Sequence, residues 1–75
     1  MFKPGTLVRL KPTVERYRSW IADCPDYKGD YKGIDYWVSK HDIGLMLGYD
    51  YDNRHVRVLI GERIVLIAPE VLNIV

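Results

Sequence analysis

The chain has 75 residues, which is the size of one small domain. Its composition is globular, with 48% hydrophobic and 28% charged residues, and eleven Lys and Arg against ten Asp and Glu leave a net charge of +1. This balance argues against binding to nucleic acid through bulk charge, the single cysteine excludes an internal disulfide framework, and no apolar run approaches the ~18 residues of a membrane span. We therefore expect one soluble, cytoplasmic domain over residues 1–75, without membrane insertion.

The first predicted element is a short strand over residues 6–10. Turn-forming Pro and Gly residues lie on both sides of this segment, which is itself rich in β formers. Alternation along a strand places Val8 and Leu10 on one face and Leu7 and Arg9 on the other.

The next segment, from about residue 13 to residue 42, is a long insertion. Val14, Tyr17 and Ile21 fall at helical spacing, so a short helix is one interpretation of its first part. Residues 36–38 fit either a small strand or a buried clamp. A connection of this length in a small domain is usually functional or disordered, and its aromatic content argues against disorder.

The C-terminal part predicts a three-strand meander, a helical turn and a last strand. Apolar residues alternate with others between turn signals, and Pro69 cannot continue a central strand. The predicted elements are strands at 43–49, 55–60 and 64–67, a helical turn at 69–72 and a closing strand that reaches residue 75. With the first strand, this makes five.

This layout resembles an SH3-like barrel. Lys3-Pro4-Gly5-Thr6-Leu7-Val8-Arg9-Leu10 resembles the opening strand of such barrels, Ile43-Gly44-Leu45-Met46 resembles their second strand, and Pro69-Glu70-Val71-Leu72-Asn73-Ile74-Val75 resembles their helical turn and last strand. The predicted fold is therefore mostly all-β: an SH3-like five-stranded small barrel with a long aromatic-rich insertion between strands 1 and 2.

Within that fold, the sequence is most similar to small uncharacterised SH3-like proteins encoded by tailed bacteriophages. It resembles SH3-like subunits of photosynthetic complexes more weakly. The phage resemblance implies a non-enzymatic accessory protein that acts in the host cytoplasm. Tyr49-Asp50-Tyr51 is similar to a run in signalling SH3 domains that bind proline-rich peptides, but it follows the second strand instead of lying in the first long loop, so we do not expect that activity.

The insertion holds most of the aromatic residues. Tyr and Trp are favoured in protein–protein contacts, so these side chains predict a partner-binding surface. A lid over the barrel is the structural alternative, because alternation sends about half of the apolar strand residues to a second face that needs a cover. A protein partner or a homodimer would also supply that cover. The predicted partner-binding residues are Tyr17, Trp20, Tyr27, Tyr31, Tyr36 and Trp37.

Nucleic-acid binding is the alternative function. Small barrels can bind nucleic acid with basic and aromatic side chains, and the candidate basic residues are Arg9, Lys11, Arg16 and Arg18. Seven aspartates between residues 21 and 52 oppose this interpretation, because nearby carboxylates repel phosphate.

Catalysis and metal binding have little support in the sequence. Cys24, His41 and His55 show no spacing that demands a nucleophile–base pair or a zinc site. Residues 50–53 begin like a calcium loop but lack its glycine and its distal glutamate. We therefore predict no enzyme, no metal site and no cofactor.

Overall fold

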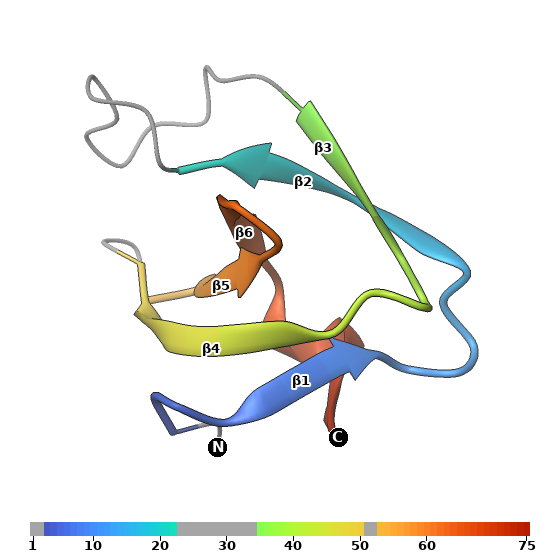
Figure 1. Ribbon diagram of the computed structural model, residues 1–75, viewed down its shortest axis with the longest axis horizontal. Coiled ribbons are helices and arrows are strands. Elements are labelled where there is room, and N and C mark those ends of the chain that lie inside the picture. The colour runs from blue at the N-terminus through green and yellow to red at the C-terminus, as the bar shows by residue number, and fades with distance from the viewer. Residues whose placement is uncertain (1–2, 23–34, 51–52) are drawn as a thin grey trace.

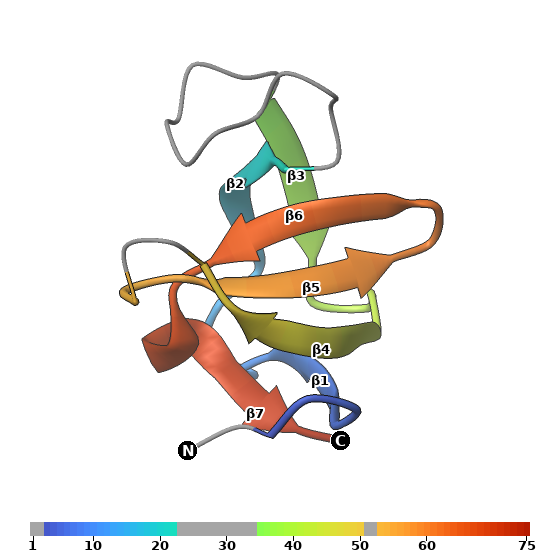
Figure 2. The same ribbon diagram turned by 90° about the vertical axis from the view of Figure 1, so that its left-hand side faces the viewer.

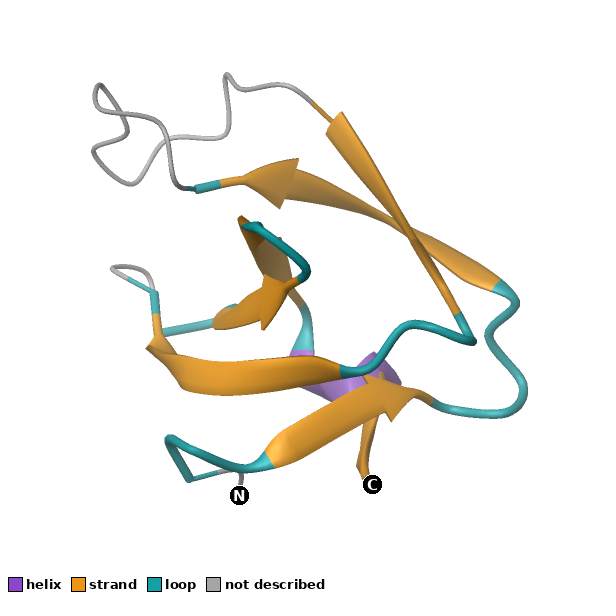
Figure 3. Ribbon diagram, in the orientation of Figure 1, coloured by secondary structure: helices purple, strands orange, loops and turns teal. Residues whose placement is uncertain are grey.

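The computed structural model describes residues 3–22, 35–50 and 53–75, and the regular elements of these residues are almost all β-strands (Figures 1 and 3). The only helical element in these ranges is one short 3-10 turn, which is too short to cross a membrane. In chain order the elements are β1 (Leu7–Leu10), β2 (Arg16–Ile21), β3 (Asp35–Ser39), β4 (Gly44–Tyr49), β5 (Val56–Ile60), β6 (Arg63–Ile67), η1 (Pro69–Val71) and β7 (Leu72–Ile74).

The seven strands of the described residues form one antiparallel sheet in the order β3-β2-β6-β5-β4-β1-β7. Figure 2 shows this order, with β2 and β3 at the top and β7 at the bottom. The sheet curls around one face and forms a half-barrel (Figure 1). Since β1 pairs with both β4 and β7, the last strand returns beside the first.

The predicted β class is confirmed, whereas the predicted strand number is wrong. The five expected strands correspond to β1, β4, β5, β6 and β7, and the expected helical turn is η1. The insertion adds two more strands, β2 and β3.

The short helix proposed for the start of the insertion is also wrong, because this segment is β2. Tyr17 and Ile21 are four residues apart, a spacing that suits one helix face and also one strand face. Pairing with β6 decides between the two, since Ile21 lies opposite Val65 and Trp20 lies opposite Leu66. Tertiary pairing therefore overrides the local pattern.

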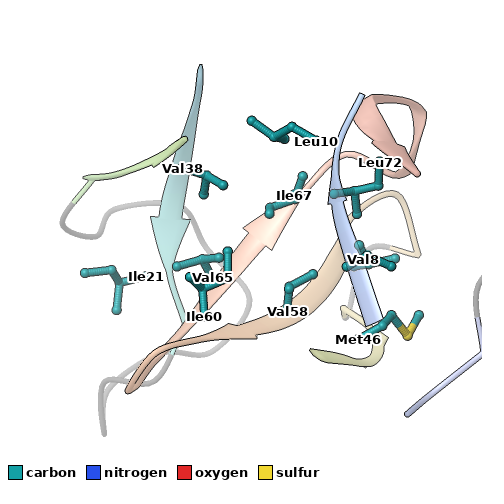
Figure 4. Packing of buried hydrophobic residues seen from close by; sticks show 11 residues of the cluster. Val8, Leu10, Ile21, Val38, Met46, Val58, Ile60, Val65, Ile67 and Leu72 are labelled. Carbon is teal, nitrogen blue, oxygen red and sulfur yellow. The ribbon is translucent and has the colours of Figure 1, made fainter. Parts of the chain in front are cut away.

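One hydrophobic core serves every strand. The apolar side chains of the inner face are almost completely buried and form one cluster along the concave side of the curled sheet (Figure 4). Their burial explains the alternation in β1, where Val8 and Leu10 are buried and Leu7 and Arg9 are exposed, as predicted. The core residues are Val8, Leu10, Ile21, Val38, Met46, Val56, Val58, Ile60, Val65, Ile67 and Leu72.

The described part of the insertion continues the sheet. Its two strands pair with each other, and β2 pairs with β6. Ile21 of β2 and Val38 of β3 then enter the core from this side (Figure 4). The hairpin is thus a structural wall of the half-barrel and also the element that positions the candidate binding residues.

Candidate protein-binding surface

Alternation divides the side chains of β2 between two faces. Tyr17, Ser19 and Ile21 point to the core, and Ser19 is completely buried. Arg16, Arg18 and Trp20 consequently point to the opposite, outer face of the sheet. β3 follows the same rule, with Val38 buried and Trp37 on the outer face.

Tyr17 and Tyr36 attach the hairpin to the core. Both are partly buried and pack against the core cluster. The Tyr17 hydroxyl accepts a hydrogen bond from the backbone N–H of Ala68 at 3.3 Å. The backbone carbonyl of Tyr36 accepts one from the hydroxyl of Ser19 at 2.6 Å. The side chains of Tyr17 and Tyr36 therefore have a mainly structural role.

Trp20 and Trp37 lie on the outer face but differ in exposure. Trp20 is half-buried and lies opposite Leu66, which is fully buried although it is outside the core cluster. Trp37 is 55% exposed. Among the predicted binding residues that the structure describes, Trp37 offers the most accessible aromatic ring. Tyr27 and Tyr31 lie outside the described residues.

Charged side chains surround Trp37. The Arg16 guanidinium lies 4.9 Å from the centre of the Trp37 ring, within the range of a cation–π interaction. The register places Arg18 directly opposite Trp37, and Arg18 Nε donates a hydrogen bond to Asp35 Oδ2 at 2.6 Å. Trp37 thus lies beside two guanidinium groups and one carboxylate.

An apolar row crosses the same outer face. Leu7, Leu45, Leu59 and Ile64 lie opposite one another in register across β1, β4, β5 and β6. Leu7 is 50% exposed and the other three are half-buried. Part of the surplus of apolar strand residues expected from the sequence therefore forms a single line across the sheet.

The four residues of the nucleic-acid alternative do not form one cluster. Arg9 is on β1, whereas Arg16 and Arg18 are on β2, with β6, β5 and β4 between them in the sheet. The cationic groups of Arg16 and Arg18 are engaged by Trp37 and Asp35. Lys11 follows β1, where its backbone N–H bonds to Val71.

The residues considered for catalysis or metal binding are scattered or outside the described part of the chain. His41 is exposed in the turn after β3, and His55 is half-buried just before β5. Cys24, Tyr51 and Asp52 are not among the residues that the structure describes. No group of three or more His, Cys, Asp or Glu side chains within residues 3–22, 35–50 and 53–75 could hold a metal ion.

Sequence reasoning predicted apolar residues on a second face but not their alignment into a row, and it did not select Asp35 as part of the surface. Asp35 carries no local signal, because its partner Arg18 is 17 positions away in the chain. The members of the row come from four strands, so the strand order had to be known first.

The sequence matches no protein-family model, and the comparisons with curated proteins and with solved structures found no match.

Proposed function

We propose that this chain is a non-enzymatic protein-interaction module built on an SH3-like small barrel. The order β7-β1-β4-β5-β6, a long insertion after β1 and a 3-10 turn before the last strand support the barrel assignment. The resemblance to accessory proteins of tailed bacteriophages supports a host or phage protein as the partner. The insertion and the adjoining outer strand face form the proposed contact surface.

The exposure of Trp37 is the observation that carries the proposal. A tryptophan that is 55% exposed on a strand leaves a large apolar area in water, and Arg16 limits its freedom by lying over the ring. Trp and Arg are the residue types most enriched at energetic hot spots of protein interfaces. A rigid aromatic ring with an adjacent guanidinium is thus ready to bind a partner protein.

Affinity capture from a bacterial lysate tests this proposal. We expect wild-type protein to retain a specific protein after nuclease treatment, and Trp37→Ala to lose it. Tyr49→Ala is the matched control, because Tyr49 is an exposed aromatic residue at the end of β4, outside the insertion. If folded Trp37→Ala captures the same proteins as wild type, Trp37 is not part of a binding surface.

Nucleic-acid binding remains the second candidate because the outer face carries more positive than negative charge. Its described strands present Arg9, Arg16, Arg18 and Arg57 against Asp35. Fluorescence anisotropy with single-stranded RNA and duplex DNA at low salt measures this directly, since the phosphate contribution is then strongest. Under the leading proposal we expect no binding, and salt-dependent binding would favour the second candidate.

A further inference from the structure

Among the described strands, β3 lies at one edge of the sheet (Figure 1). The pairing of β3 with β2 determines which of its backbone groups face outward. The Lys40 N–H donates to the Glu15 carbonyl at 3.0 Å, so the ladder directs the backbone groups of Lys40, Val38 and Tyr36 toward β2. The alternate residues Asp35, Trp37 and Ser39 must therefore direct their backbone N–H and C=O groups away from β2.

The outward-facing groups of Ser39 are already satisfied within the chain. Its N–H donates to the Asp42 carboxylate at 2.8 Å, and its carbonyl accepts a hydrogen bond from the Asp42 N–H at 3.0 Å. For Asp35 and Trp37, the described part of the chain supplies no partner to these groups. Unpaired edge groups of this kind are a template for another strand.

We infer that this edge pairs with β3 of a second copy of the chain. Asp35 and Trp37 are two residues apart, so an antiparallel pair of β3 strands with its twofold axis at Tyr36 places each Asp35 opposite a Trp37. Both residues then exchange N–H and C=O bonds, which makes four hydrogen bonds. The contact is isologous and closes at a dimer.

The side chains are self-complementary in this register. On the outer face, the Asp35 carboxylate of each copy lies directly opposite the Trp37 ring of the other, and the Arg18 guanidinium of that other copy lies one strand further on, so the acidic and basic side chains of the two copies alternate across the joined sheets. On the inner face, the two Tyr36 residues form a non-hydrogen-bonded pair, with Cα atoms about 4.5 Å apart. An unrelated extended peptide would have to supply this pattern by chance.

The dimer is expected to be weak and reversible. Asp42 occupies the edge at Ser39, so the pairing involves only a few residues on each side. A contact this short falls below the ~1,000 Å² of buried surface that a stable interface needs. The expected behaviour is a monomer–dimer equilibrium that shifts with protein concentration.

Sedimentation velocity over micromolar to millimolar concentrations tests the inference. We expect wild type to approach the mass of two chains, and Trp37→Pro to dissociate about tenfold more easily than Trp37→Ala, because only proline removes the outward N–H. Proline is tolerated at a position of an edge strand whose N–H does not enter the ladder, so the fold should survive, as circular dichroism will check.

A cysteine trap tests the register. In a Cys24→Ser background, Tyr36→Cys should form an intermolecular disulfide rapidly, because the two Cα atoms fall within the range of about 4.4–6.8 Å that a disulfide spans. Glu62→Cys is the control, since residue 62 is exposed in the turn between β5 and β6.

The two experiments can overturn the inference separately from the proposed function. A wild-type monomer at every concentration, equal dissociation of the two Trp37 variants, or Tyr36→Cys cross-linking no faster than Glu62→Cys would each contradict a β3–β3 dimer. If wild type is a monomer while Trp37→Ala still captures a protein that Trp37→Pro does not, the edge binds a segment of another protein instead.

Discussion

Gly44 is the residue at which one added methyl group should be most disruptive. A Cβ there would overlap Cγ1 of Val58 and lie 2.8 Å from Cγ1 of Ile60 and 3.2 Å from the Leu59 carbonyl oxygen. Gly44 therefore lets β4 lie close against the densely packed core side chains of its neighbour β5.

We expect Gly44→Ala to lower the free energy of unfolding by about 1–3 kcal/mol, the usual cost of overpacking a core. Gly5→Ala is the matched comparison: its Cβ would meet no atom within 4 Å, and only its positive φ of 91° makes it strained. A positive φ costs a residue with a side chain about 1–2 kcal/mol. Urea denaturation measures both, and a loss for Gly44→Ala that is smaller than the loss for Gly5→Ala would show that β4 has room at Gly44.

Ser19 is the second residue with a local prediction. Its hydroxyl is completely buried and donates to the Tyr36 carbonyl at 2.6 Å, which joins the two strands of the hairpin. Ser19→Ala should cost about 0.5–1.5 kcal/mol, the net value of such a hydrogen bond. Ser39→Ala serves as the comparison, because the Ser39 hydroxyl accepts only an exposed backbone bond. A smaller loss for Ser19→Ala than for Ser39→Ala in thermal melts would contradict this.

At the scale of elements, the β2–β3 hairpin depends on its two tryptophans unequally. Trp20 covers the outer face beside Leu66, whereas more than half of the Trp37 surface is in water. We expect Trp20→Ala to lower the free energy of unfolding by about 2–4 kcal/mol and Trp37→Ala by about 1 kcal/mol or less. Chemical denaturation of the two variants measures the difference. A larger loss for Trp37→Ala would mean that its ring is structural.

This difference determines which variants can test function. A double Trp20/Trp37 alanine variant combines a stability change with a surface change, so lost capture would have two explanations. Trp37→Ala alone removes the exposed ring while leaving the contacts of Ile21 and Val38 with the core intact. The Arg18–Asp35 pair is more than half exposed on its Arg side and contributes less than about 1 kcal/mol. Variants of that pair can therefore test binding without unfolding the hairpin.

At the scale of the whole molecule, one core connects all seven strands, so the hairpin and the barrel strands should unfold together. Within the native state, the free energy of local opening should still differ from strand to strand across the sheet. β5 and β6 lie between other strands, and Val56, Val58 and Val65 are fully buried, whereas β3 and β7 are edges. We expect backbone amides of β5 and β6 to exchange slowest.

Hydrogen exchange followed by NMR checks this order. The ladder-bonded amides of β5 and β6 should exchange only through global unfolding, and those of β7 should exchange through local fraying. A faster rate in β6 than in β7 would indicate that the hairpin separates from β6 as an independent unit.

The sequence by itself determined the elements whose pattern is local. The alternation of apolar residues predicted β1 and β5, turn-forming residues predicted where strands end, and Pro69 predicted the 3-10 turn. These features could be predicted because each depends on the backbone preferences of a few consecutive residues. It also indicated that apolar side chains would remain on a second face. It could not separate helix from strand for β2, since Tyr17 and Ile21 satisfy both periods.

Only the tertiary structure decided how the insertion is used. Pairing with β6 made β2 a strand, and alternation from that register sent Tyr17 and Tyr36 to the core and Trp37 to the outer face. Aromatic residues that are close together in the chain therefore have two different roles: some stabilise the core and others are exposed on the outer face. The physical reason is that a strand's two faces are assigned by its partners, and β6 lies more than 40 positions along the chain from β2.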